Sequence, residues 1–251
     1  MTAARSKRTG APLSAARSKP AAASPKDVLA RLRQALPEPR CELDHQNAWQ
    51  LLIATILSAQ STDARVNVVT PALFKRYPTP KALGSAQLPE VEELVRTTGF
   101  FRNKAKNIVG ASRIVAEQHG GEVPRSLEAL IELPGVARKT ANVVIGTAYG
   151  VPTGFIVDTH AGRVARRLGL TQSEDASEVE RDLCEAFPKS EWVAMGHRFV
   201  LHGRYVCTAR KPACRSCPLA EICPAREEEP EGSLAARCKA ENTLVSARGS
   251  T

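Results

Sequence analysis

Apolar residues recur at helical spacing through most of the chain. A repeat of every three to four residues is clearest in the segments 49–57, 90–97, 103–118 and 179–187, and Pro and Gly residues separate these segments. We find no strand pairs with hairpin signals and no internal repeat. The pattern therefore predicts an all-α fold.

The two ends of the chain lack this periodicity. Residues 1–24 are mostly Ala, Ser, Pro, Arg and Lys, so we expect a disordered basic tail. An organellar transit peptide has a similar composition, but Pro12, Pro20 and Gly10 would interrupt its amphipathic helix. Residues 225–251 are largely polar, and we expect them to form a mobile tail.

Composition and net charge narrow the class of protein only a little. With 43% hydrophobic and 24% charged residues the chain is typical of a globular protein, and no apolar run is long enough to cross a bilayer. The formal net charge of +9 favours a nucleic-acid partner, since Lys and Arg are attracted to phosphates. Residues 1–26, however, supply six of these positive charges, so net charge alone does not identify the partner.

A hairpin between two helices is predicted at residues 133–137. Ser126 can cap a short first helix that must end before Pro134, and Gly135 permits a tight turn into a second helix, so the motif spans 126–149. Backbone N–H groups at the start of the second helix, together with its dipole, favour an anion such as a DNA phosphate. An ordinary connection between two helices has the same local pattern, so both interpretations stay open.

Lys139 falls in the first turn of this second predicted helix. The helix dipole disfavours a cation there, and Arg138 adds like-charge repulsion, so both effects favour the neutral amine. A neutral lysine can attack a carbonyl carbon and form a Schiff base. A solvated surface charge remains the alternative interpretation of this lysine.

Asp158 follows an apolar segment and precedes a helical pattern, which predicts that it caps a helix N-terminus. Backbone N–H groups would also keep its carboxylate ionised. Near a sugar, such a carboxylate could stabilise positive charge or relay a proton from Lys139. The spacing in the sequence does not show whether Lys139 and Asp158 meet.

Four of the seven cysteines crowd into residues 207–223 with the spacing C-x6-C-x2-C-x5-C. A compact run of four thiolates, with proline after a cysteine, suits a 4Fe-4S cluster, although the spacing alone leaves zinc open. This crowding, and the lack of an apolar leader core, indicate a reducing compartment and a metal site in preference to disulfides. The candidate ligands are Cys207, Cys214, Cys217 and Cys223.

The cysteine run also lies in a locally basic stretch. No acidic residue occurs from position 192 through position 220. A local basic patch is a stronger indication of nucleic-acid contact than the net charge of a whole chain. The basic residues in or beside the cysteine loop are Arg204, Arg210, Lys211 and Arg215.

The segments LPGVARKTANVV, VDTH and LHGRYVCTARKPACRSC resemble the corresponding stretches of bacterial endonuclease III. The resemblance covers about residues 27–224. It implies a six-helix barrel domain at 45–151, which carries the helix-hairpin-helix motif. It also implies an iron-sulfur cluster domain formed by 25–44 and 152–224. DNA would bind across the cleft between the two domains.

The resemblance also assigns the functional residues. It places the catalytic lysine on Lys139, the catalytic aspartate on Asp158, and the ligands of one 4Fe-4S cluster on the four cysteines at 207–223. The residue that fills the gap left by an extruded base falls on Gln60, and the strand wedge falls on Phe100. Further DNA contacts are expected at Leu133, Gly135, Ala137, Arg138, Arg210 and Lys211.

Two positions depart from the family pattern. Ala137 stands where a second glycine is usual in the hairpin, and because alanine resists positive φ we expect weakened or re-aimed phosphate binding. Phe100 stands where a leucine is usual. A larger wedge that can stack on bases is expected to alter which opposing base or lesion the protein prefers.

The implied function is that of a bifunctional DNA N-glycosylase and abasic-site lyase in base excision repair. A monomer would act on double-stranded DNA that contains oxidised pyrimidines or abasic sites, in the cytoplasm of a bacterial cell at the nucleoid. An adenine glycosylase of the same superfamily is a rival, but it has a glutamate at the position of Ala54 and lacks the lysine. A non-catalytic iron-sulfur DNA-binding protein is a second rival, which would need no nucleophile at Lys139.

Overall fold

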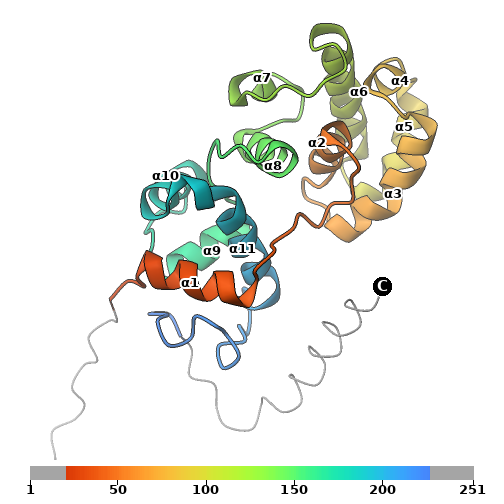
Figure 1. The fold of residues 1–251 in the computed structure, drawn as a ribbon. Coiled ribbons are helices and arrows are strands. Elements are labelled where there is room, and N and C mark those ends of the chain that lie inside the picture. The colour runs from red at the N-terminus through yellow and green to blue at the C-terminus, as the bar shows by residue number, and fades with distance from the viewer. Residues whose placement is uncertain (1–20, 227–251) are drawn as a thin grey trace, which may run out of the picture.

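The computed structural model describes residues 21–226, and within that range every regular element is helical (Figure 1). This confirms the prediction of an all-α fold. Residues 1–20 of the predicted basic tail, with its transit-peptide alternative, lie outside the described residues, as do Cys238 and the predicted C-terminal tail from residue 227 onward. The prediction of disorder is wrong for the end of the basic tail, because Ala23 is buried and its N–H donates to the Leu168 carbonyl at 2.8 Å. None of the described helices is long and apolar enough to cross a membrane.

The helices correspond closely to the predicted segments. The four segments that showed the clearest periodicity are α2, α5, α6 and α10, and their ends shift by at most three residues. In chain order the elements are α1 (Pro25–Ala35), α2 (Ala48–Leu57), α3 (Asp63–Arg76), α4 (Pro80–Gly84), α5 (Leu88–Val95), η1 (Arg96–Thr98), α6 (Phe101–Gln118), α7 (Leu127–Ile131), α8 (Arg138–Tyr149), α9 (Thr159–Arg167), α10 (Ala176–Ala186), η2 (Lys189–Glu191) and α11 (Trp192–Tyr205).

One hydrophobic core gathers the inward faces of α2 to α8. Helix α2 forms its centre because it is apolar on all sides, and Leu51, Leu52 and Ile53 are fully buried. In Figure 1, α3 to α6 surround α2 on one side and α8 lies on the other. This arrangement places the N-terminal end of α8 at the margin of the core.

A second hydrophobic core joins α1 to α9, α10 and α11, which lie far from it in the sequence (Figure 1). Three aromatic rings, those of Phe155, Phe187 and Phe199, meet in this core with centroids 5.4 to 5.9 Å apart. The buried Arg198 guanidinium donates to the carbonyl of Leu36 at 2.8 Å, at the point where the chain leaves α1. The domain boundaries given above remain predictions.

Helix α8 belongs to the first core and also contacts α11 of the second. Gly146 provides the close approach, because a Cβ atom at this position would lie 3.0 Å from a methyl group of Val193. At the next residue, Thr147 Oγ1 lies 3.0 Å from Nε2 of His197. The C-terminal half of α8 is therefore packed against α11 as well as against the first core.

Candidate functional site

The predicted hairpin connects α7 and α8. Ser126 Oγ accepts the N–H of Ala129 at 3.2 Å, which confirms that Ser126 caps the short first helix. Gly135 has a φ of 78°, and a Cβ atom there would lie 2.8 Å from the Asn107 side chain. Both the backbone geometry and the packing therefore require glycine at this position. The Leu133 side chain is buried beneath the hairpin.

Ala137 is the N-cap residue of α8 and has an extended backbone, with φ −92° and ψ 170°. Alanine adopts this conformation without strain. The premise that this position needs positive φ is therefore wrong, and the expected effect on phosphate binding stays a prediction. Since the first helical hydrogen bond runs from the Ala141 N–H to the Ala137 carbonyl, the N–H groups of the first turn are left for capping partners or an anion.

Arg138 forms an ion pair with α10. Its Nε donates to Glu180 Oε2 at 2.8 Å, and the hydrogen bond to this carboxylate is the largest cause that raises the pKa of Arg138. The other carboxylate oxygen of Glu180 accepts the Asn142 amide at 3.0 Å. Because the Glu180 carboxylate offsets the charge of Arg138, the like-charge repulsion on Lys139 is weaker than the sequence suggested.

Asp158 caps the N-terminus of α9, as predicted. Its Oδ1 accepts the backbone N–H groups of His160 and Ala161, both at 2.8 Å. The three residues before Asp158, at 155–157, are buried, so the chain that leads into this cap is anchored in the second core. The carboxylate is therefore held in a fixed position.

Lys139 and Asp158 line one cleft of about 600 Å³. Gln60 lines the same cleft and has a left-handed backbone, with a φ of 52°. The structure thus brings together Gln60 of the α2–α3 connection, Lys139 of α8 and the N-cap residue Asp158 of α9, whose proximity the sequence spacing could not show. A smaller cavity of about 50 Å³ is also lined by Lys139 and Asp158.

The smaller cavity contains polar residues that sequence reasoning missed. Burial lowers the pKa of His197 to about 4, and the positive charge of Lys139 acts in the same direction. Asp63 Oδ2 accepts a hydrogen bond from Arg204 Nη1 at 2.6 Å, and Glu42 accepts from the same nitrogen. Arg204 was predicted to belong to the basic patch, but it is paired with these two carboxylates.

Phe100 lies outside the residues that line these two cavities. It is the N-cap of α6 and has a left-handed backbone, with a φ of 46°. Its side chain is exposed, with 68% of its surface accessible to solvent. An aromatic side chain that protrudes from a strained turn is suited to contact another molecule.

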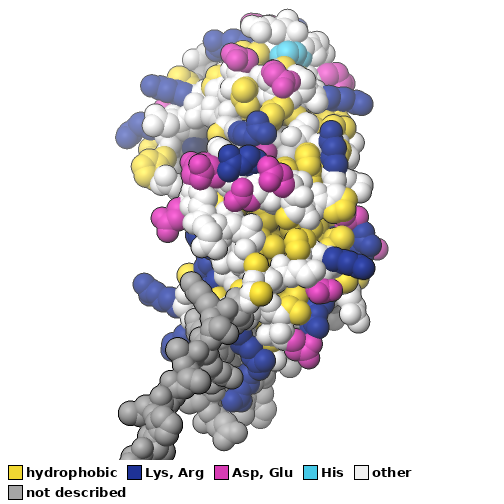
Figure 2. Space-filling view, turned by 90° about the vertical axis from the view of Figure 1, so that its left-hand side faces the viewer, with side chains coloured by type: hydrophobic (Ala, Val, Ile, Leu, Met, Phe, Trp, Pro, Cys, Tyr) yellow, Lys and Arg dark blue, Asp and Glu magenta, His cyan; other side chains and the backbone are white. Residues whose placement is uncertain are grey.

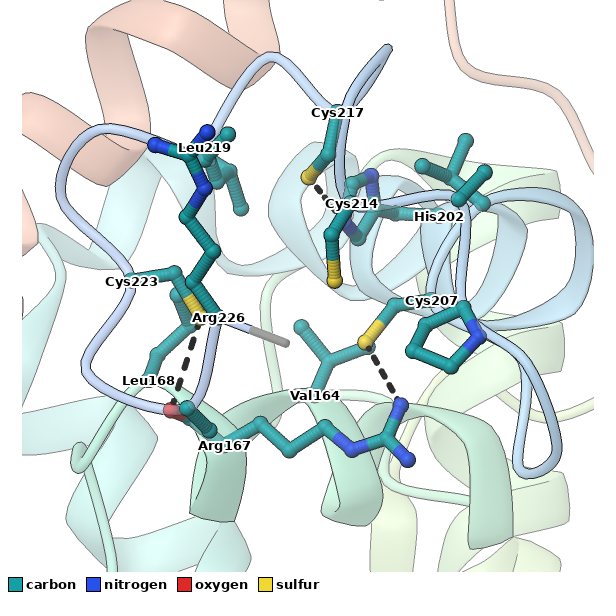
Figure 3. A pocket seen from close by; sticks show the side chains of 15 residues that line it. Val164, Arg167, Leu168, His202, Cys207, Cys214, Cys217, Leu219, Cys223 and Arg226 are labelled. Carbon is teal, nitrogen blue, oxygen red and sulfur yellow. Dashed lines mark hydrogen bonds between the residues drawn. The ribbon is translucent and has the colours of Figure 1, made fainter. Parts of the chain in front are cut away.

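The four cysteines of the 207–223 loop line one cavity, and their sulfur atoms surround it in Figure 3. Burial raises the pKa of Cys217 to about 11, and the three other thiols add to this effect. Within the described range, no three His, Cys, Asp or Glu side chains are arranged to hold a single metal ion. Four thiols that face one cavity are the donor set that a 4Fe-4S cluster uses.

Helix α9 connects the cysteine loop to Asp158. Arg167 Nη1 donates to Cys207 Sγ at 3.2 Å (Figure 3) and to the Thr208 carbonyl at 2.8 Å. One turn earlier, Arg163 Nε donates to the carbonyl of Cys207 at 3.0 Å. The same helix therefore carries the Asp158 cap at its start and fixes the cysteine loop at its end.

Basic side chains do not dominate the face drawn in Figure 2, where Lys and Arg are interspersed with Asp and Glu. In the cysteine loop, Arg210 and Lys211 are exposed. Thr208 Oγ1 donates to the carbonyl of Arg210 at 2.8 Å, and Lys211 has a φ of 56°, so the backbone that carries these two cations is held in a defined turn. Contact with DNA is therefore better supported in this loop than by the net charge.

A helical hairpin therefore lies beside a cleft that Lys139 and Asp158 share, and the helix that Asp158 caps holds the four-cysteine loop. Residues 53–189 match the family model of the HhH-GPD superfamily of base excision DNA repair proteins. Residues 207–223 match the model of the iron-sulfur binding domain of endonuclease III.

Individual relatives are similar over most of the chain. The endonuclease III of Synechocystis sp. is 52% identical over 201 residues, which are 80% of this chain and 92% of the relative. That of Escherichia coli K12 is 43% identical over 202 residues, or 80% and 95% of the two chains. A solved structure described as a non-covalent endonuclease III–DNA complex is 46% identical, with a TM-score of 0.76, and the match covers 80% of this chain and 94% of that one. The chain belongs to the endonuclease III family, which confirms the resemblance.

Proposed function

We propose that this chain is a bifunctional DNA N-glycosylase and abasic-site lyase that removes oxidised pyrimidines from duplex DNA in base excision repair. The observation that carries the proposal is the shared cleft of about 600 Å³, which is lined by both Lys139 and Asp158. Its volume suits an extruded nucleotide, because small-molecule sites typically measure roughly 300–1,000 Å³. Extrusion is needed since the sugar carbon cannot be reached inside the stack.

Lys139 is the proposed nucleophile. Its Nζ attacks C1′ of the extruded nucleotide, and the bond from C1′ to the damaged base breaks as the base leaves with its electron pair. Opening of the sugar ring gives a Schiff base between Nζ and C1′. Loss of a proton from C2′ and cleavage of the bond between C3′ and its oxygen then cut the strand on the 3′ side of the site.

Asp158 is proposed to support these steps without forming a bond to the sugar. Its carboxylate is fixed by two backbone N–H groups at 2.8 Å, so it is already oriented before the substrate arrives. Beside the sugar it stabilises the positive charge that develops as the base departs. It also relays protons to and from Lys139.

The four cysteines of the 207–223 loop are proposed to hold one 4Fe-4S cluster, which organises the loop when bound. We expect the cluster to stabilise the loop and to position the protein on DNA, because Arg163 and Arg167 of α9 connect the loop to the helix that Asp158 caps. The chemistry at C1′ needs no electron transfer. These ligands are Cys207, Cys214, Cys217 and Cys223.

The proposed DNA interface extends from the hairpin across the cleft to the cysteine loop. First-turn N–H groups of α8 can bind a backbone phosphate without reading sequence. We propose that the protein acts as a monomer in the cytoplasm, at the nucleoid. The DNA contacts are Gln60, Phe100, Leu133, Gly135, Ala137, Arg138, Arg210 and Lys211.

Borohydride trapping tests the proposal directly. Duplexes that each carry one defined oxidised pyrimidine, together with an abasic duplex, are incubated with the wild type and with Lys139→Gln. The wild type should cleave the lesion strands and leave a reduced covalent adduct, and Lys139→Gln should do neither while it still binds lesion DNA. Adduct formation by Lys139→Gln would assign the nucleophile to another amine, and absence of any adduct with the wild type would overturn the proposed function.

A further inference from the structure

One buried lysine is not used by the proposed chemistry. Lys104 lies in the first turn of α6, and only 4% of its surface is exposed. Its ammonium donates to the carbonyl of Thr98 at 2.6 Å, and burial alone accounts for the lowered pKa of this lysine. A charged group is rarely buried without a carboxylate partner, because desolvation of the charge is costly. The position therefore calls for a specific explanation.

The carbonyl that Lys104 binds belongs to the turn that carries Phe100. This turn ends η1 at Thr98 and continues through two successive left-handed residues, Gly99 at φ 71° and Phe100 at φ 46°. A left-handed conformation is unfavourable for phenylalanine, so surrounding contacts must maintain it. The Thr98 hydroxyl donates to the Val95 carbonyl at 2.8 Å, which fixes the other side of the turn.

Lys104 contacts this turn at both of its ends. Its Nζ binds the Thr98 carbonyl before the left-handed pair, and its backbone N–H donates to the carbonyl of Phe100 at 3.1 Å after it. The ammonium also lies at the C-terminal end of η1, where a helix favours a cation. Removing the ammonium would release the Thr98 side of the turn and allow Phe100 to relax toward negative φ.

We propose that Lys104 is a positioning residue, which holds the 98–100 turn so that the exposed Phe100 ring is aimed to enter the base stack opposite an extruded nucleotide. This inference rests on the proposed function, in which Phe100 is the wedge. A wedge that is already oriented loses less conformational entropy on binding DNA. More of the binding free energy is therefore available to separate the bases. Lys104 itself touches neither the DNA nor the reacting atoms.

The test compares lesions that need a wedge with lesions that do not. Lys104→Met keeps the length and the apolar stem but removes the donor, and Lys106→Met is the matched control because Lys106 is exposed on the same helix. Each variant is assayed on an abasic site in a fully paired duplex and on the same site within an unpaired bubble. Fluorescence of 2-aminopurine opposite the site reports unstacking of that base.

Lys104→Met should slow cleavage of the paired duplex roughly ten- to a hundredfold. It should also abolish the fluorescence rise while leaving cleavage in the bubble unchanged, and Lys106→Met should behave as the wild type. Combined with Phe100→Ala, it should add no further loss, since both changes remove the same function. Equal losses on both substrates, an unaffected duplex rate, or additive losses with Phe100→Ala would each overturn the inference.

A second variant keeps the test valid if Lys104→Met does not fold. Gly99→Ala strains the turn, because φ is 71°, yet a Cβ atom there meets no other atom within 4 Å. It should show the same loss confined to the paired duplex, and a wild-type rate on the duplex would contradict the inference. Failure of the wild type itself on both substrates would count against the proposed function instead.

Discussion

Glu180 and Arg138 form an ion pair of 2.8 Å that ties the first turn of α8 to α10, one residue from Lys139. The Glu180 side chain is 9% exposed, and its second oxygen accepts the Asn142 amide. Glu180→Ala should therefore lower the free energy of unfolding by about 1–3 kcal/mol, because it leaves the buried Asn142 amide without its carboxylate partner. Urea unfolding measures this loss.

Glu185→Ala is the matched control for this prediction, since Glu185 is exposed on the same helix. It should change the free energy of unfolding by less than about 0.5 kcal/mol. A Glu180 variant that is as stable as this control would show that the network does not anchor the start of α8.

The cysteine loop gives a second prediction. Cys214→Ser should yield protein with much less bound iron and sulfide and with weaker visible absorption, because one of four thiolate ligands is lost. The loop should also become sensitive to proteolysis, since cluster binding stabilises its folded form. Cys184→Ser is the control, because this cysteine belongs to α10 and does not line the cluster cavity. Stoichiometric zinc without iron in the wild type would contradict the assignment of the cluster.

Buried His197 makes stability depend on pH. Its pKa falls from 6.5 when unfolded to about 4 in the fold, so between these values the unfolded chain takes up a proton that the native state does not. The contribution of His197 to the free energy of unfolding is fully present above pH 6.5. It decreases by roughly 2–3 kcal/mol as the pH falls toward 4. His197→Gln can retain a hydrogen bond to Thr147 and should reduce this acid-dependent loss. Identical pH profiles of the two proteins would rule out this contribution.

Local sequence signals predicted the elements and their caps, while the contacts that complete the site come from elsewhere in the chain. The caps formed by Ser126 and Asp158 involve neighbours within three residues, so the local sequence was sufficient to identify them. The pairing of Arg138 with Glu180 joins positions 42 residues apart. The periodicity of apolar residues does not report such a contact.

Backbone conformation is a second feature that the sequence did not predict correctly. The expectation for Ala137 assumed that a position often occupied by glycine needs positive φ, whereas the N-cap is extended at φ −92°. His197 was missed because its neighbours in α11 follow an ordinary core pattern, and only the packing of α11 against α8 brings it to Lys139. The sequence also did not indicate the contact of the Lys104 ammonium, since its partner is a backbone carbonyl.

Asp158→Asn separates the two roles assigned to Asp158. Asparagine caps a helix almost as well as aspartate, so the variant should keep the hydrogen bonds to His160 and Ala161 and lose less than about 1 kcal/mol of stability. It lacks the charge that is proposed to stabilise the cationic sugar, so single-turnover base release should slow by roughly a hundredfold or more. Lesion-DNA affinity, measured at the same salt concentration, should change little. Because Lys139 is intact, borohydride should still trap an adduct on a preformed abasic site, at a reduced rate. If Asp158 were only a cap, the folded Asn variant would release the base at close to the wild-type rate, and the carboxylate would have no part in the chemistry.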